Sequence, residues 1–285
     1  MDFECISKSK TQFFIKVILP IMQKNLTRTE SDLLGAVEVP ENVLYGVQTM
    51  RGLENFPISK FRLSDYPRFI RGLAIVKLGA AEANYRLGLL TDEVYEAIAA
   101  ACREIMAGEH HEHFPVDMIQ GGAGTTTNMN ANEVIANRAL ELMGHQRGEY
   151  QFCSPNDDVN RSQSTNDAYP AAIHMGLYAT HLELREHLLQ LIGALRKKGD
   201  EFAQILKMGR TQLEDAVPMT LGQTFNGFAS VLEDALAHLD YASREFLTVN
   251  MGATAIGTGI CAEPGYAELS TAAIADLTGW DVVLA

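Results

Sequence analysis

Small hydroxyl and amide side chains are concentrated at three places in the sequence. The stretch SQSTND occupies residues 162–167 directly ahead of an apolar-striped segment, and GGAGTTTNMN occupies residues 121–130 ahead of another. A helix start exposes unpaired N–H groups and carries partial positive charge, and Ser, Thr and Asn add short neutral donors. These two stretches predict a carboxylate or phosphate site that needs no cation. The third stretch, GRTQ at 209–212, lies between two expected long helices.

Each stretch taken alone also fits ordinary helix capping, which uses the same residue types. The glycines at 121–124 could suggest a nucleotide-binding loop, but no G-K-[ST] ending follows them. Asp157 and Asp158 could form an acid/base or metal pair, although such pairs more often cap a turn.

Histidines offer a second set of candidates. His110, His111 and His113 lie in a polar stretch without the spacing of metal ligands, which favours a solvated loop. His174 and His181 are seven residues apart on one expected helix, and packing is the simpler interpretation. The sequence therefore predicts no metal and no cofactor.

The bulk composition limits the possible partners and location. The net charge is -13, which argues against nucleic acid or an anionic membrane as partner. The four cysteines are scattered without C-x-x-C spacing, so we expect a reducing, cytoplasmic setting. The apolar segment 13–22 is too short to span a bilayer and lacks the cleavage site of a signal peptide.

Hydrophobic periodicity predicts helices rather than strands. We expect a helix pair within 69–107, a helix at 128–144, two long helices at 171–198 and 228–249, and a shorter helix at 266–278. Apolar residues of the two long helices follow the three-and-four spacing of a bundle seam; they are Leu177, Leu184, Leu188, Leu191 and Leu195 in the first and Phe228, Leu232, Ala235, Leu239, Ala242, Phe246 and Val249 in the second.

The fold class predicted is mainly α, with an irregular helical N-terminal domain followed by an incomplete long-helix bundle. We expect a disordered extension at 1–27, an N-terminal domain at 28–163 and a partial central bundle domain at 164–285. An up-down bundle closes its core with about four helices. Two long helices and one short one therefore suggest a truncated chain or one that depends on other copies.

Four segments together closely resemble the aspartate ammonia-lyase branch of the aspartase/class II fumarase superfamily. The likeness runs from about Ser31 to Ala285. It is densest in GGAGTTTNMNANEVIANRALELMG (121–144), PNDDVNRSQSTNDAYP (155–170), KMGRTQLEDAVPMTLGQ (207–223) and NMGATAIGTG (250–259).

The resemblance implies a homotetramer whose active sites combine segments of three subunits. The reaction implied is anti elimination of ammonia from L-aspartate to give fumarate, through an aci-carboxylate intermediate. The implied substrate contacts are Thr125, Ser164, Thr165, Asn166, Thr211 and Gln212. A secondary anion site is implied at Asn156 and Asp157, where Ser154 stands in place of the family's histidine.

Two positions separate the aspartases from their fumarate hydratase relatives. Fumarases typically carry GSGT and GRTH where this sequence has Ala123 and Gln212, which favours the ammonia-lyase. Fumarate hydratase stays an alternative, as does a non-catalytic helical scaffold. The resemblance implies that the base, a serine, lies beyond Ala285, so we expect this chain alone to be inactive.

Overall fold

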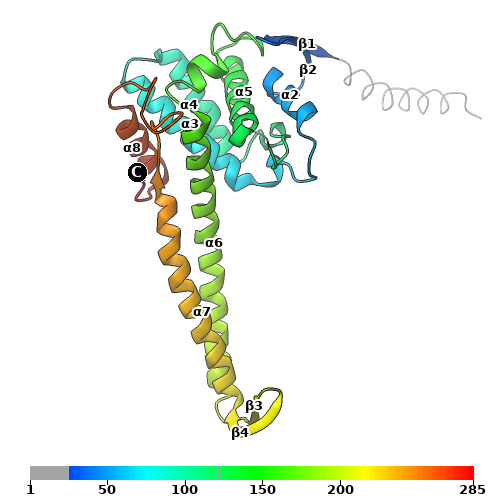
Figure 1. Ribbon diagram of the computed structural model, residues 1–285, viewed down its shortest axis with the longest axis vertical. Helices are drawn as coiled ribbons and strands as arrows, with labels where there is room; N and C mark the ends of the chain where they lie inside the picture. The colour runs from blue at the N-terminus through cyan, green and yellow to red at the C-terminus, as the bar shows by residue number, and fades with distance from the viewer. Residues whose placement is uncertain (1–25, 121) are drawn as a thin grey trace, which may run out of the picture.

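The computed structural model of the protein describes residues 26–120 and 122–285. A helical body lies at one end, and a long helical hairpin projects from it (Figure 1). Most of the extension expected at 1–27 lies outside the described residues, and Thr27 already opens the first strand.

The body is built mainly from the part of the chain before residue 160. Its elements, in chain order, are β1 (Thr27–Asp32), β2 (Gly35–Pro40), α2 (Val47–Asn55), η2 (Leu63–Asp65), α3 (Pro67–Arg86), α4 (Asp92–Ala107), η3 (His111–His113), η4 (Gly122–Gly124), α5 (Thr125–Leu142) and η5 (Pro155–Val159). Strands β1 and β2 form an antiparallel hairpin, with Thr27 opposite Pro40.

The helix pair α3 and α4 begins and ends where local chemistry dictates. Pro67 occupies the first turn of α3, where its missing N–H costs nothing. The Thr91 hydroxyl accepts from the Val94 N–H to cap α4, and Gly108 ends it in the left-handed region at φ 102°. The helix pair predicted within 69–107 is confirmed.

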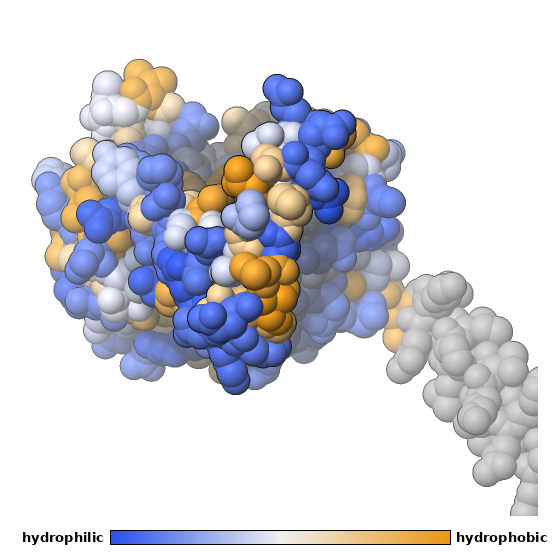
Figure 2. Space-filling view, turned by 90° about the horizontal axis from the view of Figure 1, so that it is seen from below, coloured by the Kyte–Doolittle hydropathy of each residue, from blue (hydrophilic) through white to orange (hydrophobic). Residues whose placement is uncertain are grey.

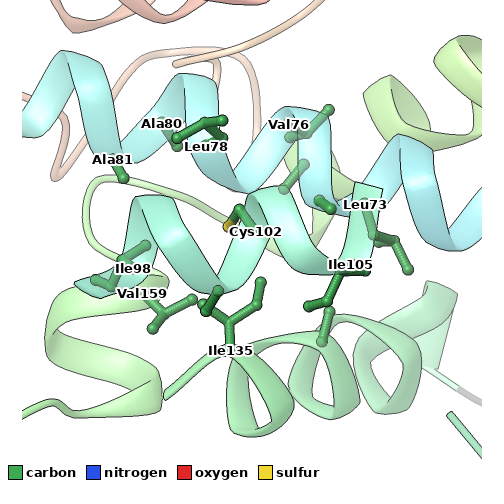
Figure 3. Close-up of a cluster of buried hydrophobic side chains, with 14 of the residues drawn as sticks. Leu73, Val76, Leu78, Ala80, Ala81, Ile98, Cys102, Ile105, Ile135 and Val159 are labelled. Atoms are coloured by element: carbon green, nitrogen blue, oxygen red, sulfur yellow. The ribbon is translucent and has the colours of Figure 1, made fainter. Parts of the chain in front are cut away.

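The main core lies between α3, α4 and α5. Leu73 of α3 lies near Ile105 of α4, and Ile135 of α5 lies on the other side of α4 (Figure 3). Each of these side chains is buried. This packing holds the start of α5 in a fixed place, and α5 begins in one of the polar stretches.

The hairpin and the C-terminal segment complete the fold. Their elements are α6 (Thr165–Glu201), β3 (Leu206–Thr211), β4 (Glu214–Thr220), α7 (Leu221–Ser243), η6 (Arg244–Leu247), β5 (Thr248–Val249), α8 (Tyr266–Thr278) and β6 (Val283–Leu284). Helix α7 returns antiparallel to α6, and β3 and β4 form the turn at the far end (Figure 1). The prediction of a mainly α fold with long helices is confirmed.

The packing between α6 and α7 corrects the predicted seam. The residues buried between the helices are Ile192, Ala229 and Leu236, flanked by Leu188, Leu195 and Leu232. Leu184, Leu191 and Phe228 are exposed instead. A two-helix hairpin buries only one stripe of each helix, so the other apolar positions stay on the surface of a single chain.

Exposed apolar side chains also surround the far end of the hairpin. Seen from that end, orange apolar atoms lie among blue polar ones (Figure 2). Leu206, Leu213 and Val217 of the β3–β4 hairpin are among the exposed residues. Within residues 26–120 and 122–285, no helix combines the length and apolar character needed to cross a bilayer.

Two expectations from the sequence concern the strands and the domain division, and their outcomes differ. The sequence predicts no strands, but the described residues contain three two-stranded sheets. The domain division at 163 and 164 stays a prediction. Helix α6 begins next to that point, yet Ala168 and Met175 of α6 and Tyr266 of α8 belong to the same core as the N-terminal helices.

Candidate active site

The start of α6 is fixed by a reciprocal cap. The Ser164 hydroxyl oxygen accepts from the Asn166 N–H at 3.1 Å, and the Asp167 carboxylate accepts from the Ser164 N–H at 3.0 Å. Ser164 is therefore a genuine N-cap, as the simpler interpretation held. Among the described residues, its hydroxyl donates to no protein acceptor, so its hydrogen can serve a ligand.

A loop from the C-terminal segment holds the same helix start. The Asn166 side-chain amide donates to the Ala255 carbonyl at 2.8 Å, and Asn250 Nδ2 donates to the Asn166 carbonyl at 3.1 Å. The buried Asp167 carboxylate accepts from the Thr254 N–H at 2.9 Å. Burial raises the pKa of Asp167, and hydrogen bonds from backbone N–H groups, including those of Ser164 and Thr254, oppose that rise.

The turn before α5 approaches α6 closely. Ala123 and Gly124 both have left-handed backbone angles, at φ 54° and 89°. The ring of Tyr169 lies against Gly124, only 2.6 Å from where a Cβ atom would be. The Thr125 hydroxyl donates to the Gly122 carbonyl at 2.7 Å, which leaves its oxygen as an acceptor.

Gln120 holds the base of this turn. Its side-chain oxygen accepts from the Thr127 N–H at 3.0 Å, and its amide donates to the Thr127 hydroxyl and the Asp117 carbonyl. The Asp117 carboxylate in turn accepts from the Ser59 N–H and hydroxyl. Hydrogen bonds therefore connect the segment before the turn to Thr127 of α5 and to Ser59.

The two polar stretches enclose a pocket of about 460 Å³. Its lining residues are Met118, Gln120, Ala123, Gly124, Thr165, Asn166, Tyr169, Pro170 and Ile173. None of these described residues carries a formal charge at neutral pH, and burial raises the pKa of the Tyr169 phenol further above its ordinary value of 10. The volume and the neutral donors suit a small dicarboxylate.

The structure brings together only part of the predicted set. Thr165 and Asn166 line the pocket, while Ser164 and Thr125 lie beside residues that do. Thr211 and Gln212 lie at the β3–β4 turn, at the other end of α6. Because α6 has 37 residues, that end is about 55 Å away along the helix axis. Within one chain, Thr211 and Gln212 cannot reach this pocket.

Asn156 and Asp157 line a separate pocket of about 340 Å³. Arg161 and Glu263 also line it, so it holds charges of both signs. The Ser154 hydroxyl caps η5 by accepting from the Asp157 N–H at 3.0 Å. Asp157 thus takes part in a capped turn, while an anion site here stays a prediction.

The histidines lie in structural contacts. His181 is buried, with Nε2 3.1 Å from Asp240 Oδ1, and His174 Nδ1 is 3.0 Å from the Thr248 carbonyl. His110 Nε2 lies 2.9 Å from Glu104, whose carboxylate also accepts two hydrogen bonds from Arg138. Glu104, Glu109 and His110 lie close enough to hold a metal ion, but Arg138 already neutralises Glu104.

Sequence reasoning missed a buried network behind the pocket. Lys77 of α3 is fully buried and donates to the side chains of Asn160 and Gln163. The available signal was a lysine at helical spacing with Ile70 and Leu73 on the apolar face of its helix. Its partners are more than 80 residues away in sequence, so they could not be read from local patterns.

The fold therefore places a neutral, donor-lined pocket at the base of a long antiparallel helix pair. The chain belongs to the Lyase family, whose sequence model matches residues 35–285. An aspartate ammonia-lyase from Pseudomonas canavaninivorans is 56% identical over 257 residues, covering 90% of this chain. The chain spans about half of that relative's length, at 54%.

Solved structures agree with this assignment. A fumarate lyase:delta crystallin from Brucella melitensis bound to cobalt has a TM-score of 0.90 and 48% identity, covering 91% of this chain and 56% of its own. A class II fumarase from Schistosoma mansoni has a TM-score of 0.84 and 35% identity, covering 89% of this chain and 53% of its own.

Proposed function

We propose that this chain forms part of an ammonia-lyase that converts L-aspartate to fumarate and ammonium. The observation that carries the proposal is the meeting of the α6 start with the Gly122–Gly124 turn around a neutral pocket of about 460 Å³. The 56% identity to an aspartate ammonia-lyase supports the choice of substrate.

The hydrogen bonds suggest how the substrate is held. Asn166 uses its side-chain N–H₂ on the Ala255 carbonyl, so its Oδ1 is left as an acceptor for the substrate ammonium. The Thr165 and Ser164 hydroxyls at the α6 start are donors for a carboxylate. Thr125, which donates to its own turn, serves as a further acceptor.

The proposed reaction is an anti elimination. A base takes the proton from the carbon next to one carboxylate, and the electron pair moves into that carboxylate to give a doubly charged aci-carboxylate. The pair then forms the carbon–carbon double bond as the bond to nitrogen breaks and ammonia leaves. Donors fixed before the reaction stabilise the aci form because they need not reorient as its charge develops.

The base has to come from outside the described pocket wall. Tyr169 is the only ionisable residue among those lining it, and burial raises the pKa of its phenol. It therefore keeps its proton at neutral pH and cannot accept one from carbon. We therefore propose that a residue outside this pocket lining acts as the base.

A second part of the proposal is that copies of the chain assemble, as a homotetramer, to complete the site. Thr211 and Gln212 lie far from the pocket of their own chain, and the exposed Leu184, Leu191 and Phe228 offer apolar faces for other copies. A long-helix bundle made from several chains would bury those faces and bring a Thr211 to a neighbour's pocket.

The proposal also includes a cytoplasmic location. Cys102 and Cys153 are buried free thiols, and Cys261 is an exposed one. An exposed free thiol fits a reducing compartment, since oxidising compartments favour disulfides.

The test is fumarate absorbance after L-aspartate is added to protein made from the continued coding sequence. We expect fumarate from L-aspartate and none from L-malate. Activity on L-malate alone would establish the fumarate hydratase alternative. Inactivity on both substrates would leave the non-catalytic scaffold. The 285-residue chain alone is the matched control and should produce no fumarate.

A further inference from the structure

A lysine that the proposed reaction does not use lies buried behind the pocket. The Lys77 side chain of α3 has no exposed surface. Its Nζ lies 2.8 Å from Gln163 Oε1 and 3.0 Å from Asn160 Oδ1. Burying an amine costs free energy unless it is hydrogen-bonded, so these two contacts define where the 160–163 turn can lie.

Asn160 gathers donors from two helices. Its side-chain oxygen accepts from Lys77 and also from Asn128 and Asn132 of α5, at 3.0 and 3.2 Å. Its own amide donates to the Gln163 carbonyl at 3.3 Å. Lys77 therefore connects α3 to Gln163, the residue that directly precedes Ser164. Asn160 connects α5 to the same residue.

Gln163 stabilises the 160–163 turn through hydrogen bonds of its own side chain. Its side-chain amide donates to the Val159 carbonyl at 2.9 Å and the Arg161 carbonyl at 3.1 Å, while its oxygen is held by Lys77. Without Lys77, the Gln163 side-chain oxygen would lose the hydrogen bond that the Lys77 amine donates. The amide could then rotate, and the turn would lose one of its connections to α3.

A second residue of α3 holds the same turn. Asn84 Nδ2 donates to the Arg161 carbonyl at 2.9 Å, and the Ser162 hydroxyl donates to Asn84 Oδ1 at 2.8 Å. Lys77 and Asn84 are seven residues apart, which places them on one face of the helix. Ser162 has φ 62°, a strained angle for a serine that these contacts maintain.

We propose that Lys77 is a positioning residue that holds Ser164, Thr165 and Asn166 at the pocket through Asn160 and Gln163. It acts through the turn and does not itself line the pocket. The catalytic consequence rests on the proposed function, but the structural consequence can be measured without any activity.

The first experiment compares amide hydrogen exchange of wild type, Lys77→Met and Lys60→Met by mass spectrometry on the 285-residue chain. Methionine keeps the length and apolar stem of lysine but removes its donors, and Lys60 is an exposed control. We expect exchange of the 160–167 amides to rise about tenfold in Lys77→Met, the effect of losing a hydrogen bond to a charged donor. Exchange in α4 should stay unchanged in both variants.

Unchanged exchange at 160–167 in a folded Lys77→Met protein would overturn the proposal whether or not the enzyme is active. If Lys77→Met does not fold, Gln163→Met removes the same contact from the other side and should give the same local increase. A global rise in exchange in both variants would instead assign Lys77 to core stability and overturn the positioning role.

The second experiment uses the active, continued polypeptide. Lys77→Met and Gln163→Met should each lower kcat/KM for L-aspartate by about tenfold or more, since small displacements of binding groups are costly. Each variant also removes contacts of its own, but the Lys77–Gln163 hydrogen bond is lost in both, so the double variant should lose less than the product of the two single losses. If the kcat/KM losses of the two single variants multiply in the double variant, Lys77 and Gln163 do not act through their shared contact. Inactive wild type would count against the proposed function, while the exchange result would still decide the position of the turn.

Discussion

The ring of Tyr169 lies 2.6 Å from the position that a Cβ atom on Gly124 would occupy. Gly124 belongs to the turn before α5, and Tyr169 belongs to the second turn of α6. The two polar stretches therefore meet at a contact that only glycine allows. Phe69 of α3 packs edge-on against the same tyrosine, with ring centroids 5.5 Å apart, so the ring has support on its other side.

This contact predicts that Gly124→Ala displaces the pocket wall. Gly88→Ala is the matched control, because Gly88 also has a left-handed backbone but has open space around it. Each change strains the backbone by about 1–2 kcal/mol. Only Gly124→Ala should also lower kcat/KM for L-aspartate by about tenfold or more. Equal activity losses in the two variants, measured beside their melting temperatures, would contradict the argument.

The predictions from sequence were best where local chemistry decides the structure. The helix predicted at 266–278 has those bounds, because Gly265 and Gly279 both take left-handed angles at its ends. The Thr91 cap likewise sets the start of α4 by local chemistry. The β3–β4 hairpin was missed because Leu206, Met208 and Val217 are exposed, so no buried face imposes clear alternation.

The pocket was only partly predictable for a related reason. Thr165 and Asn166 precede a helix and are visible as cap-type residues, and both line the pocket. The role of Ala255 and Thr254 depends on contacts with residues almost 90 positions away in sequence. Lys77, in the same way, is distinguished by its partners and not by its neighbours.

Lys77 also gives a pH-dependent prediction. Burial lowers the pKa of Lys77 from 10.5 to about 7. Between those values the unfolded chain binds more protons than the folded chain, so the unfolding free energy of wild type should rise with pH. This pH-dependent gain in unfolding free energy is absent at pH 6, because Lys77 is protonated there in both the folded and the unfolded chain.

The measurement is urea unfolding of wild type and Lys77→Met across pH 6–10. The difference between their unfolding free energies should move in favour of wild type as pH rises above about 7, since methionine does not titrate. A constant difference would show that the amine stays charged in the fold.

The Glu104–Arg138 pair predicts a loss of stability at acidic pH. Hydrogen bonds from Arg138 lower the pKa of Glu104 from its ordinary value of 4.5. Stability from this pair is therefore present above pH 4.5 and is lost as pH falls through the folded-state pKa. Glu104→Gln should cost about 1 kcal/mol at pH 7, a modest value because the pair is partly solvated.

Chemical unfolding of Glu104→Gln at pH 7 and pH 3 checks this prediction, with the neighbouring exposed Glu109→Gln as control. The cost of Glu104→Gln should shrink at pH 3, while Glu109→Gln should cost little at either pH. A cost that is equal at both pH values would assign the effect to packing.

Thr211 gives a prediction about the far end of the hairpin. Thr211→Val keeps the shape of the side chain and removes its hydroxyl, and Thr211 is exposed in the single chain. We expect little change in the melting temperature and a clear rise in KM or fall in kcat for L-aspartate, about tenfold, as expected for a lost substrate hydrogen bond. A change in activity below about twofold would remove Thr211 from the site.

Mixing two impaired variants tests most directly whether the pocket combines residues from different copies. Asn166→Ala and Thr211→Val chains of the continued polypeptide are expressed together, and fumarate formation from L-aspartate is compared with each variant alone. If each site takes Asn166 from one chain and Thr211 from another, random assembly should restore about a quarter of wild-type activity. No recovery in mixed assemblies that are shown to form would contradict the account.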